Sequence, residues 1–217
     1  MSKSNLKQQA YQSIRTKIMN CEYPPGMLLN ENIILEEFSG SRTPIRDALG
    51  RLEQERLVTI LPKKGILVAG LSLHDLGSIY ETRLLIEPQA LLHYGNTLPE
   101  SLYLEHFEFF NDIAATRSSI DQTYQIDDSF HIALINATNN PYLIQLYELV
   151  SVQTHRSRIL SGKLSGGRLD ESRREHLDIL VACLKGDWIT AADNLRIHLN
   201  NSKTAIIQVL SPAHIAL

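Results

Sequence analysis

Ser41-Arg42-Thr43-Pro44-Ile45-Arg46-Asp47-Ala48-Leu49 is the most informative segment of this 217-residue chain, and its neighbours extend the same pattern. Thr43 followed by Pro44 is typical of a helix N-cap with proline at the first helical position. Apolar residues then recur every three or four positions through Leu52, which predicts a helix that ends near residue 55. This spacing leaves three arginines outside the apolar face: Arg42, Arg46 and Arg51.

Two further helices are predicted on the N-terminal side of this segment. Apolar residues recur every four positions over residues 5–20, and Pro24-Pro25-Gly26 stops the pattern. Asn30 is a good N-cap for a second, short helix, and Ser39-Gly40-Ser41 would be the turn that follows it. The apolar residues that this second helix would bury are Ile34, Leu35 and Phe38.

On the C-terminal side, β-branched runs at residues 58–61 and 66–68 flank Pro62-Lys63-Lys64-Gly65, which predicts a β-hairpin with two lysines at its tip. Three short helices followed by a hairpin describe a winged helix-turn-helix, which we place at residues 1–72. From residue 73 onward the apolar pattern is helical. The expected helices lie at about 73–95, 99–116, 121–138, 141–162, 168–185 and 187–210. The sequence therefore predicts a mainly α protein, in which an all-α helical bundle at residues 73–217 follows the winged helix.

Charge is divided unevenly between these two parts. Residues 1–72 carry ten Lys and Arg against seven Asp and Glu, whereas the rest of the chain carries 11 against 17. A basic N-terminal part followed by an acidic part is expected when only the N-terminal part binds the phosphates of nucleic acid. The chain has two distant cysteines, no signal-peptide pattern and no apolar run long enough for a membrane span, so we expect a cytoplasmic protein.

The predicted third helix has the chemistry of a recognition helix, whose N-terminal end enters the major groove of DNA. Arg42 and Arg46 are long enough to reach base edges, where arginine pairs with guanine through two hydrogen bonds. Thr43 and the helix N-terminus can bind phosphate, and so can Lys63 and Lys64 at the hairpin tip. Other interpretations stay open here, because arginines on one helix are often only a solvated face and winged helices also bind proteins.

Four groups of residues in this region form a specific pattern: residues 37–49, Arg51-Leu52-Glu53, Leu57-Val58, and Lys64-Gly65 before Val68. With them the chain resembles the GntR family of bacterial regulators. The residues that the resemblance assigns to operator DNA are Arg42, Thr43 and Arg46, assisted by a wing at Lys63, Lys64 and Gly65. It also implies a homodimer on a palindromic site. Two departures are visible: the glycine of the turn is displaced to Gly40, and Arg56 stands where the family has a glycine that eases a left-handed helix end.

Histidines and an acid in the second part have spacings that can build a metal site. Asp127 and His131 are four residues apart, so a helix would place both side chains on one face. His176 and His198 lie at comparable distances from the short connection at Gly186-Asp187, so two antiparallel helices can bring them to one level. Three imidazoles and one carboxylate suit Zn²⁺ or another divalent transition ion. Histidines in helices are more often exposed or hydrogen-bonded in a core, so both interpretations stay open from spacing alone.

A second specific pattern is spread along residues 73–217: Arg83 with Glu87, Asp127-x-x-Phe130-His131, Asn140-Pro141, Arg156-x-Arg158, Glu175-His176, Gly186-Asp187 and His198-Leu199. With these residues the body resembles the FCD effector domain of the FadR-type branch of GntR regulators. The resemblance implies a divalent metal, Zn²⁺ first and Ni²⁺ or another ion next, bound by Asp127, His131, His176 and His198.

An ion bound in this way keeps coordination positions that a carboxylate can take, which suggests a small organic acid as the effector. Arginine binds a carboxylate through two hydrogen bonds, so the candidate effector-binding residues are Arg83, Arg156 and Arg158. An ion pair with Glu87 at i+4 is the alternative role for Arg83, and a solvated helix face is the alternative for the other two.

These features together predict a ligand-responsive transcription regulator that binds operator DNA, with repression as the expected output. The alternative is a metal-responsive regulator whose effector is the ion itself. An enzyme is not expected, because no nucleophile motif or phosphate loop accompanies the histidines, and Asp128 and Glu175 would point away from the ion. A scaffold whose winged helix binds protein is the remaining alternative.

Overall fold

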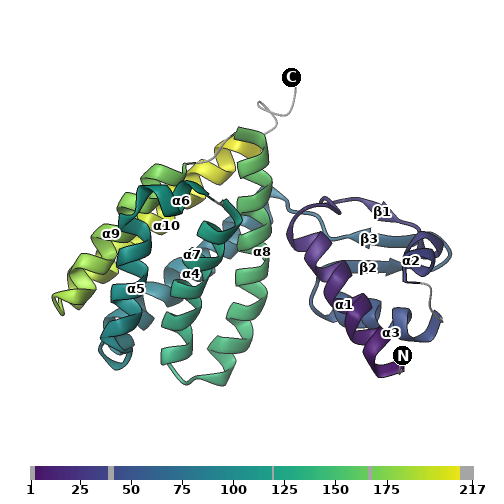
Figure 1. Ribbon diagram of the computed structural model, residues 1–217, viewed down its shortest axis with the longest axis horizontal. Coiled ribbons are helices and arrows are strands. Elements are labelled where there is room, and N and C mark those ends of the chain that lie inside the picture. The colour runs from purple at the N-terminus through teal and green to yellow at the C-terminus, as the bar shows by residue number, and fades with distance from the viewer. Residues whose placement is uncertain (1–2, 39–41, 119, 166–167, 211–217) are drawn as a thin grey trace. The chain divides into compact units, whose positions relative to one another are not determined.

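The computed structural model describes residues 3–38, 42–118, 120–165 and 168–210, so the predicted turn at residues 39–41 lies outside the described residues. The chain divides into two compact units, Met1–Leu71 and Ser72–Leu217 (Figure 1). The first unit is a winged helix and the second is a bundle of helices, which confirms the predicted fold class. Among the described helices, none has the combination of length and apolarity that a bilayer crossing needs.

The first unit combines three helices with a small antiparallel sheet. The helices are α1 Lys3–Met19, α2 Glu31–Glu37 and α3 Arg42–Gln54, and the strands are β1 Leu28–Leu29, β2 Val58–Leu61 and β3 Gly65–Val68. The strand order is β1-β3-β2, and β2 pairs with β3 from Val58↔Val68 to Leu61↔Gly65 as a hairpin. α1 packs on α3, and the core takes apolar side chains from all three helices and the hairpin: Ala10, Ile14, Ile18, Ile34, Ile45, Leu49, Leu52, Val58, Ile66 and Val68. The two-residue strand β1 was not predicted, because two residues carry no periodicity.

Of the two helix N-caps predicted in this unit, one is confirmed and the other is wrong. The Asn30 side chain accepts a hydrogen bond from the backbone N–H of Asn32 at 2.9 Å, as an N-cap does. The prediction that Thr43 is the N-cap of α3 is wrong, because α3 begins at Arg42. Pro44 still lies in the first turn, where backbone N–H groups have no acceptor within the helix, so the N–H that proline lacks is not needed there. Of the three apolar residues expected to be buried by α2, Ile34 is buried, whereas Leu35 and Phe38 are partly exposed.

Arg56 takes the left-handed backbone conformation that a glycine would adopt more easily, with φ of 57°. The N–H of Leu57 donates to the carbonyl of Leu52 at 2.9 Å, which closes the end of α3 as a glycine-terminated helix would be closed. The departure from the family pattern therefore leaves the geometry intact, at a cost of roughly 1 kcal/mol for a side chain in this conformation.

Substitution by alanine should change the stability of the first unit in opposite directions at Gly65 and at Gly50. Gly65 has φ of 125°, and a β-carbon there would lie 2.5 Å from the backbone oxygen of Leu29 in β1. Gly65→Ala should therefore destabilise the first unit by about 2 kcal/mol or more. Gly50 lies inside α3 with nothing within 4 Å of such a carbon, so Gly50→Ala should stabilise the unit by about 0.5–1 kcal/mol. Hydrogen–deuterium exchange of the β3 and α3 amides in the full chain measures both effects. Equal protection in the two variants would contradict this account of Gly65.

The second unit is helical throughout its described residues. Its elements are α4 Leu73–Tyr94, the 3₁₀ turn Gly95–Thr97, α5 Glu100–Asn111, α6 Ile113–Ser118, α7 Ile120–Ala137, α8 Pro141–Ser165, α9 Leu169–Leu184 and α10 Trp188–Leu210. α10 packs along α4 and α9, α5 packs on α9, and α7 contacts both α4 and α8 (Figure 1). A capping box begins α4, because the Ser72 hydroxyl accepts from the N–H of Asp75 and the Asp75 carboxylate accepts from the N–H of Ser72.

The single helix predicted at residues 99–116 is two helices. The chain leaves the helical conformation at Asp112, whose ψ is 101°. The Asp112 carboxylate accepts the N–H of Ala114 at 2.8 Å, so it caps the start of α6. Hydrophobic spacing alone did not reveal this break, because apolar residues continue on both sides of it.

Candidate functional site

The leading end of α3 presents polar side chains to solvent. Arg42, Thr43 and Arg46 are exposed, whereas Ile45 and Leu49 on the opposite face are buried in the core. Arg42 and Arg46 are one helical turn apart, so they lie on the same exposed face. The first unit therefore offers two arginines and a hydroxyl at the helix end that a winged helix-turn-helix would insert into DNA.

The wing, formed by β2, β3 and the turn between them, shares a groove with α3. The groove has a volume of about 830 Å³, and its polar lining residues are Asn30, Asn32, Arg46, Lys63 and Lys64. The structure thus brings Arg46 and the wing lysines to one surface, whereas Arg42 and Thr43 do not line this groove. Gly65 also lines it, and its close approach to Leu29 gives this glycine a structural role. Asn30 and Asn32 were not predicted as site residues.

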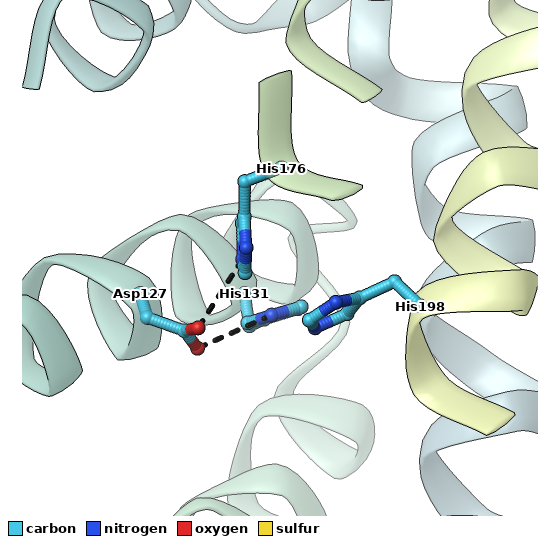
Figure 2. Close-up of side chains that lie close together, drawn as sticks. All are labelled: Asp127, His131, His176 and His198. Carbon is cyan, nitrogen blue, oxygen red and sulfur yellow. Dashed lines mark ion pairs between the residues drawn. The ribbon is translucent and has the colours of Figure 1, made fainter. Parts of the chain in front are cut away.

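The His/Asp cluster, Asp127, His131, His176 and His198, lies inside the second unit (Figure 2). α7 supplies Asp127 and His131, α9 supplies His176, and α10 supplies His198. All four side chains are buried, and one ligand atom from each lies within 4.8 Å of the others. The Asp127 carboxylate is 3.3 Å from Nε2 of His176 and 3.5 Å from Nε2 of His131. The structure therefore brings together all four residues that the sequence proposed as metal ligands.

Each imidazole of the cluster is oriented by a partner at its Nδ1. Nδ1 of His131 lies 2.7 Å from Glu87, Nδ1 of His198 lies 2.8 Å from Glu175, and Nδ1 of His176 lies 2.8 Å from the carbonyl oxygen of Ser172. An acceptor at Nδ1 keeps the proton there and leaves Nε2 as a lone-pair donor.

Nε2 of His131 and Nε2 of His176 are buried and have no hydrogen-bond partner among the described residues. A buried nitrogen lone pair without a partner is costly, and a bound cation would satisfy it. Nitrogen and carboxylate oxygen are the donor atoms that Zn²⁺ and related divalent ions accept. The residues present therefore fit a divalent transition ion.

An outer layer of residues supports two of these partners. Glu87 pairs with Arg83 and accepts a hydrogen bond from the Tyr147 hydroxyl at 2.7 Å. Glu175 accepts from Arg168 at 2.7 and 2.8 Å and from Asn201 at 2.8 Å. The Arg83–Glu87 spacing is visible in the sequence, but the contact by which Glu87 orients His131 is not, because it joins residues 44 positions apart.

The electrostatics of the cluster favour the forms that bind metal. Burial alone would raise the pKa of Asp127, but the Arg158 guanidinium and the neighbouring imidazoles hold it well below its usual value. Burial lowers the pKa of His176 well below its usual range and the pKa of His198 to about 4. At neutral pH the carboxylate is therefore ionised and these two rings are neutral, so no proton has to leave them before an ion binds.

A cavity of about 310 Å³ adjoins the His/Asp cluster, with Asp127 in its wall. Apolar residues form one part of the wall, including Phe110, Leu169, Ile206 and Val209. Polar residues form the rest, including Tyr80, Thr123, Arg158, Ser161, Arg168, Ser172 and Arg173. A cavity of this size, whose wall combines apolar side chains with charged and hydroxyl groups, suits a small polar organic ligand.

Only one of the three arginines proposed for effector binding lines this cavity. Arg158 lies in the wall and pairs with Asp127 and Asp128. Arg83 is buried and pairs with Glu87, which is the alternative that the sequence left open. Arg156 is buried, bonds to Gln153 and does not line the cavity, so neither a solvated face nor a cavity contact describes it. The sequence missed Arg168 and Arg173, because no spacing pattern indicates which helix face borders a cavity.

The two acids next to cluster residues in sequence have other partners. Asp128 bonds to Arg158 at 2.7 Å and to Nδ1 of His155 at 2.6 Å. Glu175 is engaged by Arg168 and His198, as described above. Each of these carboxylates is therefore bonded to a guanidinium and an imidazole.

The chain combines a winged helix that exposes arginines with a helical bundle that holds a buried His/Asp cluster beside a cavity. This is the architecture of a DNA-binding transcription regulator. Residues 6–68 match the bacterial regulatory proteins of the gntR family, and residues 78–201, more than half of the chain, match the FCD domain. The chain belongs to the GntR family of bacterial regulators, and its second part is an FCD domain.

Similar proteins agree with this assignment. The chain is 27% identical over 207 residues to the HTH-type transcriptional repressor RspR of Escherichia coli strain K12, which covers 94% of this chain and 90% of RspR. A crystal structure of a GntR regulator from Rhodococcus sp. RHA1 matches the fold with a TM-score of 0.78 at 19% identity, covering 93% of this chain and 97% of that one. The Zn²⁺-bound FCD domain of TM0439 matches with a TM-score of 0.55 at 27% identity, covering 66% of this chain and 99% of that domain. These relatives are regulators and not enzymes, as predicted.

Proposed function

We propose that this protein is a transcriptional repressor that binds a palindromic operator as a homodimer and responds to a small organic acid in its FCD domain. The observation that carries the proposal is the buried His/Asp cluster beside a cavity lined by arginines; two of its Nε2 atoms have no hydrogen-bond partner in the part of the chain that the structure describes. We place its action in the cytoplasm, where it would meet operator DNA.

A divalent ion, which we propose to be Zn²⁺, would be held by Asp127, His131, His176 and His198. When bound, it would supply positive charge and open coordination positions for a carboxylate. The similarity to the Zn²⁺-bound FCD domain of TM0439 supports this choice of ion. Arg158, in the cavity wall beside Asp127, is the residue of this chain that we propose to orient the acid.

The ion is proposed as a resident part of the domain and not as the signal. Its four ligands are at most 4% exposed, and each of the three imidazoles is bonded through its Nδ1 to a carboxylate or a carbonyl oxygen. We expect such a buried site to release an ion slowly, whereas a metal sensor has to exchange it. The metal-responsive regulator is the second candidate, and reversible loss of zinc at micromolar free metal would favour it.

At the DNA end, Arg42, Thr43 and Arg46 are proposed to enter the major groove, and Lys63 and Lys64 to contact phosphate beside it. Gly65 would assist by giving the wing its shape. The effector can change operator affinity only if it binds the DNA-competent and DNA-incompetent states with different affinities. An effect of about 10- to 100-fold on operator affinity corresponds to the coupling energies usual in such systems.

Native mass spectrometry of the purified full-length protein tests these assignments together. We expect a species of two chains with one zinc ion per chain and a small acid that dissociates on activation. An operator selected from random DNA should then lose affinity by about 10- to 100-fold in fluorescence anisotropy when the co-purified acid is added. Monomeric metal-free protein, or selection that enriches no sequence, would contradict the proposal.

A further inference from the structure

The arginines of the cavity wall differ in what neutralises them. Arg158 pairs with Asp127 and Asp128, and Arg168 donates two hydrogen bonds to the carboxylate of Glu175. Each of these guanidinium groups therefore already has an acidic partner inside the protein. Neither adds a net uncompensated charge to the cavity.

Arg173 has no acidic partner among the residues that the structure describes. Its Nη1 donates to the backbone oxygen of Phe110 at 3.0 Å, and its Nε is buried and has no hydrogen-bond partner within the described ranges. Glu171 also lines the cavity, but no ion pair among the described residues joins it to Arg173, so no carboxylate neutralises this guanidinium at contact distance. The position is therefore prepared for an anion that enters the cavity.

Tyr80 adds a second unused hydrogen-bonding group to the same wall. The side chain is fully buried in α4, it lines the cavity, and its hydroxyl has no partner among the described residues. Buried tyrosine hydroxyls normally have a partner, so this one is available to an oxygen of a ligand.

Arg173 also lies close to the His/Asp cluster along α9. It precedes His176 by three residues, and Ser172 and Leu169 of the same helix face also line the cavity. Phe110, whose carbonyl accepts the hydrogen bond from Arg173, stacks its ring on His176 with 4.5 Å between the ring centroids. A short ligand can therefore reach from the cluster to Arg173 within a cavity of about 310 Å³.

We propose that Arg173 binds a second carboxylate of the effector while Tyr80 donates a hydrogen bond to a ligand oxygen, so that the effector is a small dicarboxylate. The inference rests on the proposed function, in which the first carboxylate lies at the His/Asp cluster. A monocarboxylate would leave the Arg173 charge and the Tyr80 hydroxyl unsatisfied, and the protein would discriminate against it for that reason.

Calorimetric titration of the zinc-loaded full-length protein tests this inference. The probes are succinate, glutarate and adipate, each compared with the monocarboxylate of equal chain length. We expect at least one dicarboxylate to bind ten times more tightly than its monocarboxylate partner. Arg173→Gln should remove this preference and leave monocarboxylate affinity unchanged. Arg174→Gln, which removes the same charge from the adjacent exposed residue, should keep the preference.

Tyr80→Phe separates a ligand-binding role from a structural one. The variant removes a hydroxyl that has no partner in the described parts of the chain, so the thermal stability of the ligand-free protein should stay the same or rise. Affinity for the preferred dicarboxylate should fall several-fold. A loss of stability with unchanged affinity would remove Tyr80 from the inference.

The two proposals fail in different ways. If monocarboxylates bind as tightly as dicarboxylates, or if Arg173→Gln keeps the preference, the dicarboxylate inference is overturned while the organic-acid effector stands. If none of the acids binds the zinc-loaded protein, both the inference and the proposed effector class are overturned.

Discussion

Replacement of His176 by alanine should weaken zinc binding on the order of 10³-fold. Loss of a direct ligand should exceed the roughly 10- to 100-fold loss that follows removal of an outer hydrogen-bond partner. His176 is fully buried and its Nδ1 is held by the carbonyl of Ser172. Its Nε2 lies 3.3 Å from Asp127 and has no hydrogen-bond partner among the residues described. Alanine leaves only Asp127, His131 and His198 to hold the ion.

Competition with a chromophoric zinc chelator measures this affinity directly. Thermal unfolding gives an independent readout, because an ion that binds only the folded state raises the melting temperature. Zinc should therefore stabilise the wild-type protein and fail to stabilise the His176→Ala variant at the same free concentration.

His106→Ala is the matched control for this substitution. His106 is also a buried histidine of the helical unit, but both its nitrogens have protein partners, the Leu102 carbonyl at 2.7 Å and the Ser129 hydroxyl at 3.0 Å. Its removal should lower stability and leave zinc affinity unchanged. Equal loss of zinc affinity in the two variants would show that general loosening of the bundle, and not loss of a ligand, explains the result.

Replacement of Arg46 by alanine should weaken binding to a selected operator by about 10- to 100-fold and relax specificity at one base pair. This is the effect expected when an arginine that makes two hydrogen bonds to a guanine is removed. Arg46 is exposed on α3 one turn beyond Arg42, and it lines the same groove as the wing residues Lys63 and Lys64. Anisotropy titrations on the operator and on single-base variants measure both effects.

Arg51→Ala is the control for the Arg46 substitution, because it removes the same charge from the same helix. The Arg51 guanidinium lies over the Tyr11 ring at 3.7 Å and pairs with Glu55, so it is engaged within the first unit. Its loss should change operator affinity by less than about threefold, since a charge that does not touch DNA acts only through screened electrostatics. If the Arg46 variant binds every sequence as tightly as the wild type does, α3 is not the recognition helix.

The sequence could predict the first unit because its signals are local. Apolar spacing predicted α1 and α3, and the two β-branched runs around Pro62-Lys63-Lys64-Gly65 predicted the hairpin, whose register the structure now gives. Strand β1 and the break at Asp112 were missed. A two-residue strand exists only because β3 lies beside it, and the break depends on a backbone angle at one residue, so neither leaves a periodic trace.

The candidate metal ligands were also predictable from the sequence. The i, i+4 pair Asp127 and His131 is a local feature, His176 and His198 lie at comparable distances from the Gly186-Asp187 connection, and the resemblance to FCD domains implied all four as ligands. The roles of Glu87 and Glu175 were not predictable. Glu87 reaches His131 from a helix 44 residues earlier, and Glu175, expected to point away, holds His198 of the next helix.

Residue identity and short-range spacing were enough to establish that this chain has a winged helix-turn-helix, a helical bundle and a set of possible metal ligands. Packing alone settled which arginines meet the cavity: Arg158, Arg168 and Arg173 line it, whereas Arg83 and Arg156 do not. Spacing along a helix indicates which side chains share a face. What that face meets depends on neighbouring helices whose positions follow from contacts distant in sequence, so only the folded chain reveals it.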